Sequence, residues 1–370
     1  MSDPQGRPAW LVSGHQRVRD LLADSRLGRS HPNPGHPVRL TQPGLFGGPI
    51  PDPEGEQADL HRMRKLLTPS LSARRLESLR PRVETIVDGL LDELDRSGPP
   101  ADFHAVVAFP LPALVICELF GVPAEDRDDF RRWQIEAKQA SKPAVARGGL
   151  QSLWRYLGTL IERKRWLPQD DVISDLLDAA KLDAKLTDDG IAHLAAGMLF
   201  AGHAPVVAII DRGMLLLLTH PEQRAALQRE PALVGTAVEE IFRFASPIER
   251  SRATRRGGLT RYASADIEVD GVTIRVGDTV MFAVQEANED ESVFPDPQRF
   301  DITRERIPHL SLSHGAHFCL GAHLARVELQ YLFVRVFERF PTLRLAVGLD
   351  EIQPVREAVA GAVAHLPVTW

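Results

Sequence analysis

The sequence has few of the features that would place it outside the cell or in a membrane. Only two of its 370 residues are cysteine, Cys117 and Cys319, too few for a disulfide framework. The opening residues, MSDPQGRPAW, contain no apolar signal region. The formal net charge of −6 provides no general positive surface for nucleic acid or anionic lipid. We therefore expect a cytoplasmic protein that binds neither nucleic acid nor a membrane.

The longest apolar run is too short and too polar to cross a bilayer. It covers residues 195–210, is interrupted by His203 and Pro205, and is followed by Asp211. With the apolar residues that come next, it predicts a single helix over residues 187–219 that is apolar on nearly every side. Such a helix would run buried through a core.

Most of the chain has the 3.6-residue apolar spacing of amphipathic helices. This spacing predicts helices over residues 16–23, 60–67, 83–95, 103–120, 129–140, 149–165, 172–180 and 320–340. Residues 10–12 predict a strand, and alternation with Gly-containing turns predicts short strands within residues 248–283. No linker or repeat divides the chain. We predict one domain over residues 1–370, mainly α with a smaller β portion.

The most informative segment is HLSLSHGAHFCLGAHLARVEL, residues 309–329, which places Cys319 just before the last predicted helix. Unpaired N–H groups at a helix N-terminus stabilise a thiolate. Gly315 and Gly321 would leave space for a flat ligand beside the backbone. Cys319 is therefore a candidate metal ligand, or a nucleophile with His317 as its base.

Two other interpretations of this segment remain open. One is a zinc site with the ligands His314, His317, Cys319 and His323. Structural zinc sites usually join two separated segments, however, and the sequence contains no second ligand set. The other is an inert buried cysteine surrounded by unrelated histidines.

The segment resembles the cysteine loop of the cytochrome P450 superfamily, the haem-thiolate monooxygenases. That loop has an aromatic residue and a Gly, followed by Gly-x-His-x-Cys-x-Gly. The matching residues are Gly315, His317, Cys319 and Gly321, whereas Leu312 and Ser313 replace the first two. The resemblance implies haem b as cofactor, with Cys319 as the iron ligand whose thiolate favours O–O cleavage. It also implies that His317 meets a haem propionate and that Phe318 lies in the cofactor site.

Two more segments resemble cofactor-binding motifs of that family. RYASADIEVDG begins with Arg261, which matches an Arg that binds a propionate. LHRMRKLL contains Arg64, which matches another Arg with this role, but Leu60 stands where the family has a His. His61 is one residue further along, and one residue turns a helical side chain by about 100°. His61 is therefore either a haem contact or a plain surface histidine.

Glu240 and Arg243 resemble the family's Glu-x-x-Arg pair. The resemblance implies a buried structural network, closed by an Arg of the later segment FPDPQRF, which is Arg299. From spacing alone, Glu239 is an equal partner for Arg243.

The buried helix departs from the family pattern Ala-Gly-x-acid-Thr, whose acid and alcohol deliver protons to dioxygen. Ala201 and Gly202 match and His203 fills the variable position, but Ala204 and Pro205 replace the acid and the Thr. Pro205 has no N–H for the Ala201 carbonyl, which could instead hold a water or a substrate hydroxyl. His203 is either a proton donor or a core histidine with satisfied hydrogen bonds.

We take Cys319, Ala201, Gly202 and His203 as candidate catalytic residues of an oxidase or monooxygenase. It would act on a small organic molecule, such as a secondary metabolite, with protons supplied by substrate or ordered water. The alternatives are chemistry that needs little proton delivery, such as phenol coupling or peroxide-driven oxidation, and haem binding without turnover.

Two groups of basic residues suggest partners. Near the family's substrate pocket the cations are Arg250, Arg252, Arg255, Arg256 and Arg261. They would suit an anionic substrate or an acidic carrier protein, unless this is simply a solvated loop. A ferredoxin-type electron donor would dock near Cys319 on positive charge from Arg64, Lys65, Arg74 and Arg75.

Overall fold

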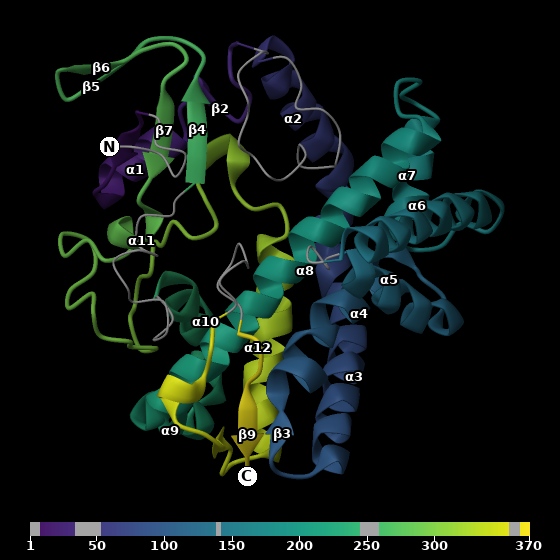
Figure 1. The fold of residues 1–370 in the computed structure, drawn as a ribbon, viewed down its shortest axis with the longest axis vertical. Coiled ribbons are helices and arrows are strands. Elements are labelled where there is room, and N and C mark those ends of the chain that lie inside the picture. The colour runs from purple at the N-terminus through teal and green to yellow at the C-terminus, as the bar shows by residue number, and fades with distance from the viewer. Residues whose placement is uncertain (1–7, 34–52, 138–141, 245–258, 355–362) are drawn as a thin grey trace.

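Helices make up most of the protein, as expected from the apolar spacing (Figure 1). The computed structural model describes residues 8–33, 53–137, 142–244, 259–354 and 363–370. The α-helices are α1 His15–Leu22, α2 Pro53–Leu67, α3 Ala73–Ser97, α4 Pro110–Phe120, α5 Arg127–Ala137, α6 Pro143–Trp166, α7 Val172–Ala180, α8 Asp188–Thr219, α9 Pro221–Arg229, α10 Val234–Arg243, α11 Val284–Ala287 and α12 Ala322–Arg339. The strands are β1 Trp10–Val12, β2 Leu27–Gly28, β3 Ala101–Asp102, β4 Leu259–Ala263, β5 Ile267–Val269, β6 Val272–Ile274, β7 Thr279–Phe282, β8 Arg344–Leu345 and β9 Pro367–Thr369.

The predicted helices are found, with ends that differ by several residues at some boundaries. Predicted segments 172–180 and 10–12 coincide with α7 and β1. The segment 103–120 divides into a π-helical turn, His104–Ala108, and α4. Pro110 and Pro112 lie at this junction, and because neither has an N–H, regular helical bonding cannot continue through it. Helices α9 and α11 and strands β2, β3, β8 and β9 were not predicted. Strands of two or three residues are too short to show alternation.

Helix α8 crosses the middle of the molecule (Figure 1). Its N-cap is Thr187, whose Oγ1 accepts a hydrogen bond from the Gly190 N–H at 3.2 Å. Helices α4, α6, α7, α10 and α12 all pack on it. By length and composition α8 could cross a membrane, yet 61% of its most apolar window is buried inside the protein. It is therefore a core helix, as the sequence predicted.

A four-stranded sheet lies to one side of α8, in the order β1-β7-β4-β2. Strand β4 runs antiparallel to β7 and to β2, with Leu27 opposite Ala263 and Gly28 opposite Tyr262. Strands β5 and β6 form a hairpin around Asp270-Gly271, within the segment predicted to contain short strands. Strand β7 joins the larger sheet and does not extend this hairpin. The sheet and α1 share a small core of their own.

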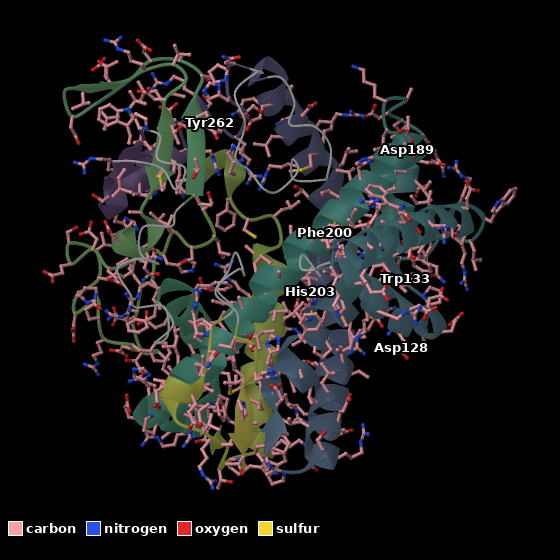
Figure 2. The ribbon with its side chains drawn as sticks, viewed as in Figure 1. Asp128, Trp133, Asp189, Phe200, His203 and Tyr262 are labelled. Atoms are coloured by element: carbon pink, nitrogen blue, oxygen red, sulfur yellow. The ribbon has the colours of Figure 1, made fainter. Side chains whose placement is uncertain are left out.

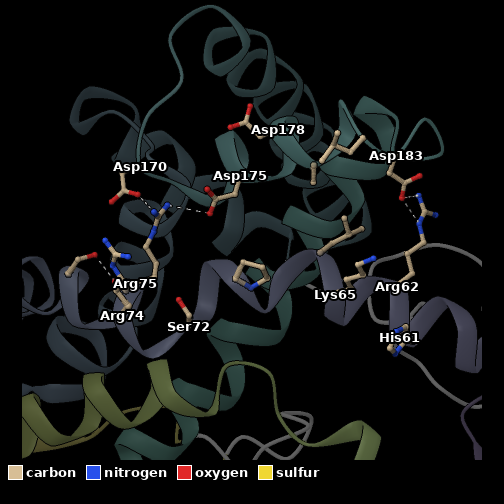
Figure 3. Close-up of a pocket in the computed structure, with 15 residues that line it drawn as sticks. His61, Arg62, Lys65, Ser72, Arg74, Arg75, Asp170, Asp175, Asp178 and Asp183 are labelled. Atoms are coloured by element: carbon tan, nitrogen blue, oxygen red, sulfur yellow. Dashed lines mark hydrogen bonds and ion pairs between the residues drawn. The ribbon is translucent and has the colours of Figure 1, made fainter.

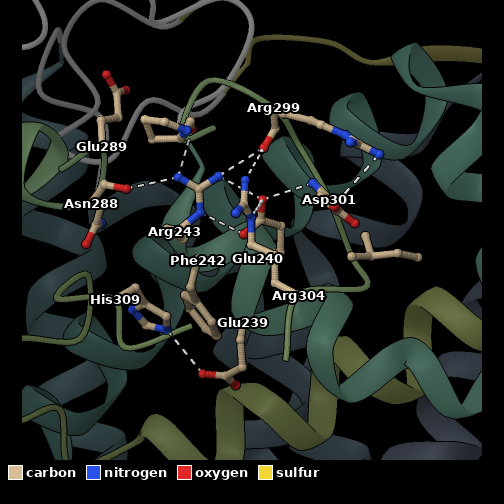
Figure 4. Close-up of polar contacts among 12 residues, drawn as sticks. Glu239, Glu240, Phe242, Arg243, Asn288, Glu289, Arg299, Asp301, Arg304 and His309 are labelled. Atoms are coloured by element: carbon tan, nitrogen blue, oxygen red, sulfur yellow. Dashed lines mark hydrogen bonds and ion pairs between the residues drawn. The ribbon is translucent and has the colours of Figure 1, made fainter. Parts of the chain in front are cut away.

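A buried ion network joins α10 to the segment that leads toward Cys319 (Figure 4). Arg243 and Glu240 are fully buried, and two hydrogen bonds of 2.7 Å connect them. Arg304 closes the network, with its Nε 3.2 Å from Glu240 Oε1. The prediction that the Arg299 side chain does so was wrong. That side chain is 62% exposed and faces Asp301, while the Arg299 carbonyl accepts from Arg243 Nη2 at 3.2 Å.

Replacing Arg304 by Gln should therefore lower the free energy of unfolding by about 2 kcal/mol, because it leaves the buried Glu240 carboxylate short of a charged donor. Arg299→Gln is the matched control and should change it by less than about 0.5 kcal/mol, since its ion pair is exposed. Urea denaturation followed by circular dichroism measures both. Equal losses in the two variants would contradict this assignment.

Candidate active site

Cys319 lies in a loop between the short turn Gly315–His317 and α12. Its N–H donates to the carbonyl of Leu312 at 2.9 Å, which folds the loop back on itself. The Cys319 side chain is exposed, whereas Cys117 is buried in the main core. The Cys319 thiol is therefore accessible to a ligand, and an inert buried cysteine is excluded.

The protein alone does not hold Cys319 as a thiolate. Desolvation by the surrounding protein raises the pKa of the thiol, although a hydrogen bond from the Gly321 N–H and the charges of Arg326 and Arg64 act in the opposite direction. The expected lowering by the helix N-terminus is thus smaller than the cost of desolvation. A bound metal ion would reverse this balance, since a coordinating thiol loses its proton outright.

The two glycines of the loop have different roles. Gly315 has a φ of +69°, and a Cβ there would lie 2.7 Å from Ala23 Cα. The backbone of Gly315 packs against the end of α1. The space expected for a flat ligand is therefore not at Gly315. At Gly321 a Cβ would meet nothing within 4 Å. The open side of the loop is therefore beside Gly321.

Ser313 adopts a backbone conformation that suits glycine. Its φ is +64°, in the left-handed region that costs a residue with a Cβ about 1 kcal/mol or more. Its Oγ is buried without a hydrogen-bond partner. The replacement of the family's Gly at this position therefore strains the loop six residues before Cys319.

Arg64, Arg261 and His317 form a polar edge beside the cysteine loop, and the two arginines make it positively charged. Arg64 of α2 donates from Nη1 to the carbonyl of Phe318 at 2.8 Å. Arg261 of β4 is only 4% exposed, and its pKa is lowered to about 10 by burial and by the charge of Arg29. The structure thus brings together the two arginines and the histidine that the sequence proposed. It adds Arg29, which the sequence interpretation missed because the two-residue strand before it gives no pattern.

His317 is neutral, and neither of its ring nitrogens has a hydrogen-bond partner among the described residues. Burial and the charges of Arg261, Arg29 and Arg64 lower its pKa to about 3. Both ring nitrogens are buried without a hydrogen-bond partner. A buried polar group without a partner is costly, so this edge suits a ligand that carries acceptors and negative charge.

His61 lies apart from this edge. It is exposed and lines a surface cavity of about 950 Å³ between α2 and α7 (Figure 3). The buried residue on the same helix face as Arg64 is Leu60, which is 9% exposed. The surface-histidine interpretation of His61 therefore fits its position better than cofactor binding does.

The zinc alternative finds no support. Within the described residues, which include His314, His317, Cys319 and His323, no group of three or more His, Cys, Asp or Glu side chains is arranged to hold a metal ion. Cys319 is therefore a candidate ligand for a metal whose other ligands come from a bound cofactor and not from the protein.

The Glu239 carboxylate pairs with Arg326 and His309 and not with Arg243. Two hydrogen bonds of 2.6 and 2.8 Å join it to Arg326. Its Oε2 also lies 3.1 Å from His309 Nε2 (Figure 4). The idea that Glu239 is an equal partner of Arg243 was wrong, because this carboxylate points toward α12. Despite desolvation, Arg326 and His309 lower the pKa of Glu239 to about 2. The Glu239–Arg326 pair thus ties α10 to the helix that follows Cys319.

One stripe of the core helix α8 is open. Ala201, Ala204 and Pro205 are exposed, and their spacing of three and four residues places them on one helix face. His203, half-way along α8 in Figure 2, is 1% exposed and faces away from that stripe. Its Nε2 lies 3.0 Å from the carbonyl oxygen of Phe109. The His203 and Phe109 rings meet edge to face, with their centroids 4.8 Å apart. The open stripe therefore carries no acid and no hydroxyl.

Comparison with known proteins identifies the family. The family profile described as cytochrome P450 matches residues 155–348. Pentalenolactone synthase of Streptomyces exfoliatus is 39% identical over 370 residues, covering 99% of this chain and 91% of the relative. The vitamin D(3) 25-hydroxylase of Pseudonocardia autotrophica is also 39% identical, with coverages of 99% and 89%.

Solved structures agree with the sequence relatives. The pimaricin epoxidase PimD has a TM-score of 0.86 at 38% identity, covering 100% of this chain and 92% of that one. The hydroxylase LnmA of Streptomyces atroolivaceus, from the leinamycin pathway, has a TM-score of 0.86 at 36% identity, with coverages of 98% and 90%. The chain belongs to the cytochrome P450 family. The expected fold, mainly α with a smaller β portion in a single domain, is thereby confirmed.

The residues of this P450 fit haem b, the cofactor of the family. The accessible Cys319 thiol suits the iron, and the surplus of buried cations suits the two propionates. Neutral His317 supplies one N–H donor, and its ring nitrogens have no hydrogen-bond partner among the described residues. The P450 assignment also makes this chain a monooxygenase that acts on a small molecule, with electrons from ferredoxin-type donors being typical of such enzymes.

Replacing Ser313 by Gly should raise the free energy of unfolding of this P450 by about 1 kcal/mol, because Gly adopts the positive φ without strain. Ser313→Ala is the matched control, since it removes the hydroxyl but keeps the Cβ. Urea denaturation of both holoenzymes separates the two effects. A similar gain in the Ala variant would assign the cost to the buried hydroxyl and not to the backbone.

Proposed function

We propose that this P450 oxidises a small organic molecule of secondary metabolism, and that the substrate or ordered water supplies the protons. The observation that carries the proposal is the open stripe of α8, whose exposed residues Ala201, Ala204 and Pro205 offer no acid and no hydroxyl. When bound at Cys319, the haem would supply the activation of dioxygen. The residues of the chain would then position the substrate and the proton source.

The protein's own contribution to proton delivery is small at this stripe. Ala204 and Pro205 have no proton to donate, and His203 points toward Phe109. Pro205 also cannot donate to the carbonyl of Ala201, because its nitrogen carries no hydrogen. That carbonyl can accept a hydrogen bond from a water or a substrate hydroxyl, which would hold the donor beside the open stripe. His203 would act by fixing α8 against Phe109, while Ala201 and Gly202 would shape the stripe.

The relatives support a biosynthetic role. Several of them carry names of biosynthetic enzymes, such as pentalenic acid synthase, nocardicin C N-oxygenase and mycinamicin IV hydroxylase/epoxidase. A substrate of that kind offers hydroxyl groups that could serve as proton donors. The hypothesis of an anionic or carrier-bound substrate depends on Arg250, Arg252, Arg255 and Arg256, which lie outside the described residues. Arg261, the fifth of that group, is buried in β4.

The electron donor would dock beside the cysteine loop. Arg64 is tied to Phe318 and reaches the loop directly. Lys65, Arg74 and Arg75 line the cavity between α2 and α7, where Arg75 is paired with Asp170 and Asp175 (Figure 3). Lys65 and Arg74 make no ion pair with a carboxylate of the described residues. They are therefore the cations that an acidic ferredoxin would contact.

The central test is the spectrum of the reduced carbon monoxide complex together with turnover. The wild type should show the red-shifted Soret band of a thiolate-bound haem and should oxidise a screened substrate with a surrogate ferredoxin system. Cys319→Ser should lose the shift, because a serine oxygen is a weaker electron donor than a thiolate. An unaltered spectrum in Cys319→Ser would refute the proposal. A normal wild-type spectrum without oxidation of any binding substrate would favour haem binding without turnover.

A second test addresses the protons. Ala204→Glu with Pro205→Thr should raise the share of consumed electrons that ends in product by about tenfold, which is less than the roughly 10²–10⁴-fold rate effect of a well-positioned proton donor. Ala204→Gln with Pro205→Val is the matched control of similar shape without these donors, and should give no gain. Reductant consumption and product formation are measured together. Loss of all activity in both variants would mean that Pro205 shapes the pocket. Oxidation driven equally well by peroxide would favour the peroxide-dependent alternative.

A further inference from the structure

Two arginines meet at the edge of the four-stranded sheet. In the antiparallel register of β2 and β4, Leu27 lies opposite Ala263 and Gly28 opposite Tyr262. The next residues in this register are Arg29, directly after β2, and Arg261 within β4. Directly opposed residues of antiparallel strands share a face, with Cβ atoms about 5 Å apart. The fold therefore places the two arginines next to each other, close enough for the charge of Arg29 to act on Arg261.

This arrangement is unfavourable without an anion. Neither arginine forms an ion pair with a carboxylate of the described residues, and Arg261 Nη1 donates to the carbonyl of Thr260 at 2.9 Å. Burial lowers the pKa of both side chains, and Arg29 lowers that of Arg261 further. Like charges directly opposed across two strands destabilise a sheet. A ligand with more than one negative charge would remove this cost.

Glu56 offsets only one of these two charges. Its negative charge raises the pKa of both arginines, but by less than burial lowers it. Its carboxylate is buried and accepts hydrogen bonds from the backbone N–H groups of Arg29, at 2.7 and 3.0 Å, and of Ser30, at 2.8 Å. A Cβ at Gly28 would lie 2.7 Å from Glu56 Oε2, so the glycine makes room for this contact. Glu56 therefore fixes the backbone around Arg29. With Arg64 of α2 also present, the edge holds three arginines and one acid.

We propose that Arg29 binds a haem propionate, in place of the histidine that this chain lacks at position 60. Leu60 is buried on the same helix face as Arg64 and offers no hydrogen bond. Arg29 approaches the same edge from the sheet side, next to Arg261. The ring nitrogens of His317 and the Oγ of Ser30, all buried and without hydrogen-bond partners, lie in the segments that meet there. The proposal rests on the P450 function, because it requires bound haem.

A carboxylate on the substrate could pair with these arginines in the same way as a haem propionate. The charges of all three arginines act on His317, two residues before Cys319, although the arginines come from three separate segments of the chain. A haem whose iron is bound to Cys319 must place its edge within reach of this loop. We therefore assign the propionate to Arg29, and the experiment distinguishes the two carboxylates.

The test compares ferric holoenzymes of the wild type, Arg29→Gln, Arg29→Lys and Arg26→Gln. Arg26 is the matched control, since it also flanks β2 but is half exposed and paired with Asp24 at 2.6 Å. Haem transfer to excess apomyoglobin is followed by the Soret band. Arg29→Gln should lose haem about tenfold faster, as expected for one lost charge-assisted hydrogen bond. Arg29→Lys should restore most of the retention, and Arg26→Gln should remain within about twofold of wild type.

A rate for Arg29→Gln within the range of Arg26→Gln would overturn the proposal. So would a change in substrate affinity without a change in haem transfer, because that result assigns Arg29 to a substrate carboxylate. If Arg29→Gln does not accumulate as holoenzyme, Arg29→Met keeps much of the side-chain length without the charge and is judged by the same rates. A thiolate-type Soret band in the variants keeps the P450 function intact whichever result is obtained.

Discussion

The position of Cys319 depends on a buried ion pair far from it in the sequence. Glu240 and Arg243 are fully buried, which is tolerable only because their charged atoms are extensively hydrogen-bonded. Arg243 Nη1 also donates to the carbonyls of Asn288 and Pro297, both at 2.9 Å. The Asn288 side chain accepts from the Leu310 N–H and donates to Ser311. The network thus anchors the start of the cysteine loop to α10.

The other end of the loop is held by charges at its surface. Arg64 binds the Phe318 carbonyl from α2, and Arg326 of α12 pairs with Glu239 of α10. The loop is therefore fixed on both sides, while the Cys319 side chain stays exposed. Its backbone carries strain at Ser313, where a positive φ meets a residue with a Cβ. A loop held at both ends, with an accessible Cys319 thiol, is what a permanently bound cofactor needs.

Much of the site was predictable because its motifs are local. Cys319, His317 and Gly321 lie within five residues, and the replacement of the acid and the Thr by Ala204 and Pro205 is visible in one helix turn. Arg299 was mistaken for Arg304 because the two are five residues apart in an irregular segment, and only the backbone path decides which side chain turns inward. Arg29 gave no signal, since a pairing of two residues leaves no periodicity to detect.

The sequence by itself determined the helical fold, the core position of α8 and the cysteine as the centre of the site, because each depends on periodicity or on contiguous residues. Only the tertiary structure decided which charges meet. It paired Glu239 with Arg326, set Arg29 beside Arg261 and directed His203 toward Phe109. Such contacts join residues up to hundreds of positions apart. Their geometry follows from how helices and strands pack, which no local pattern records.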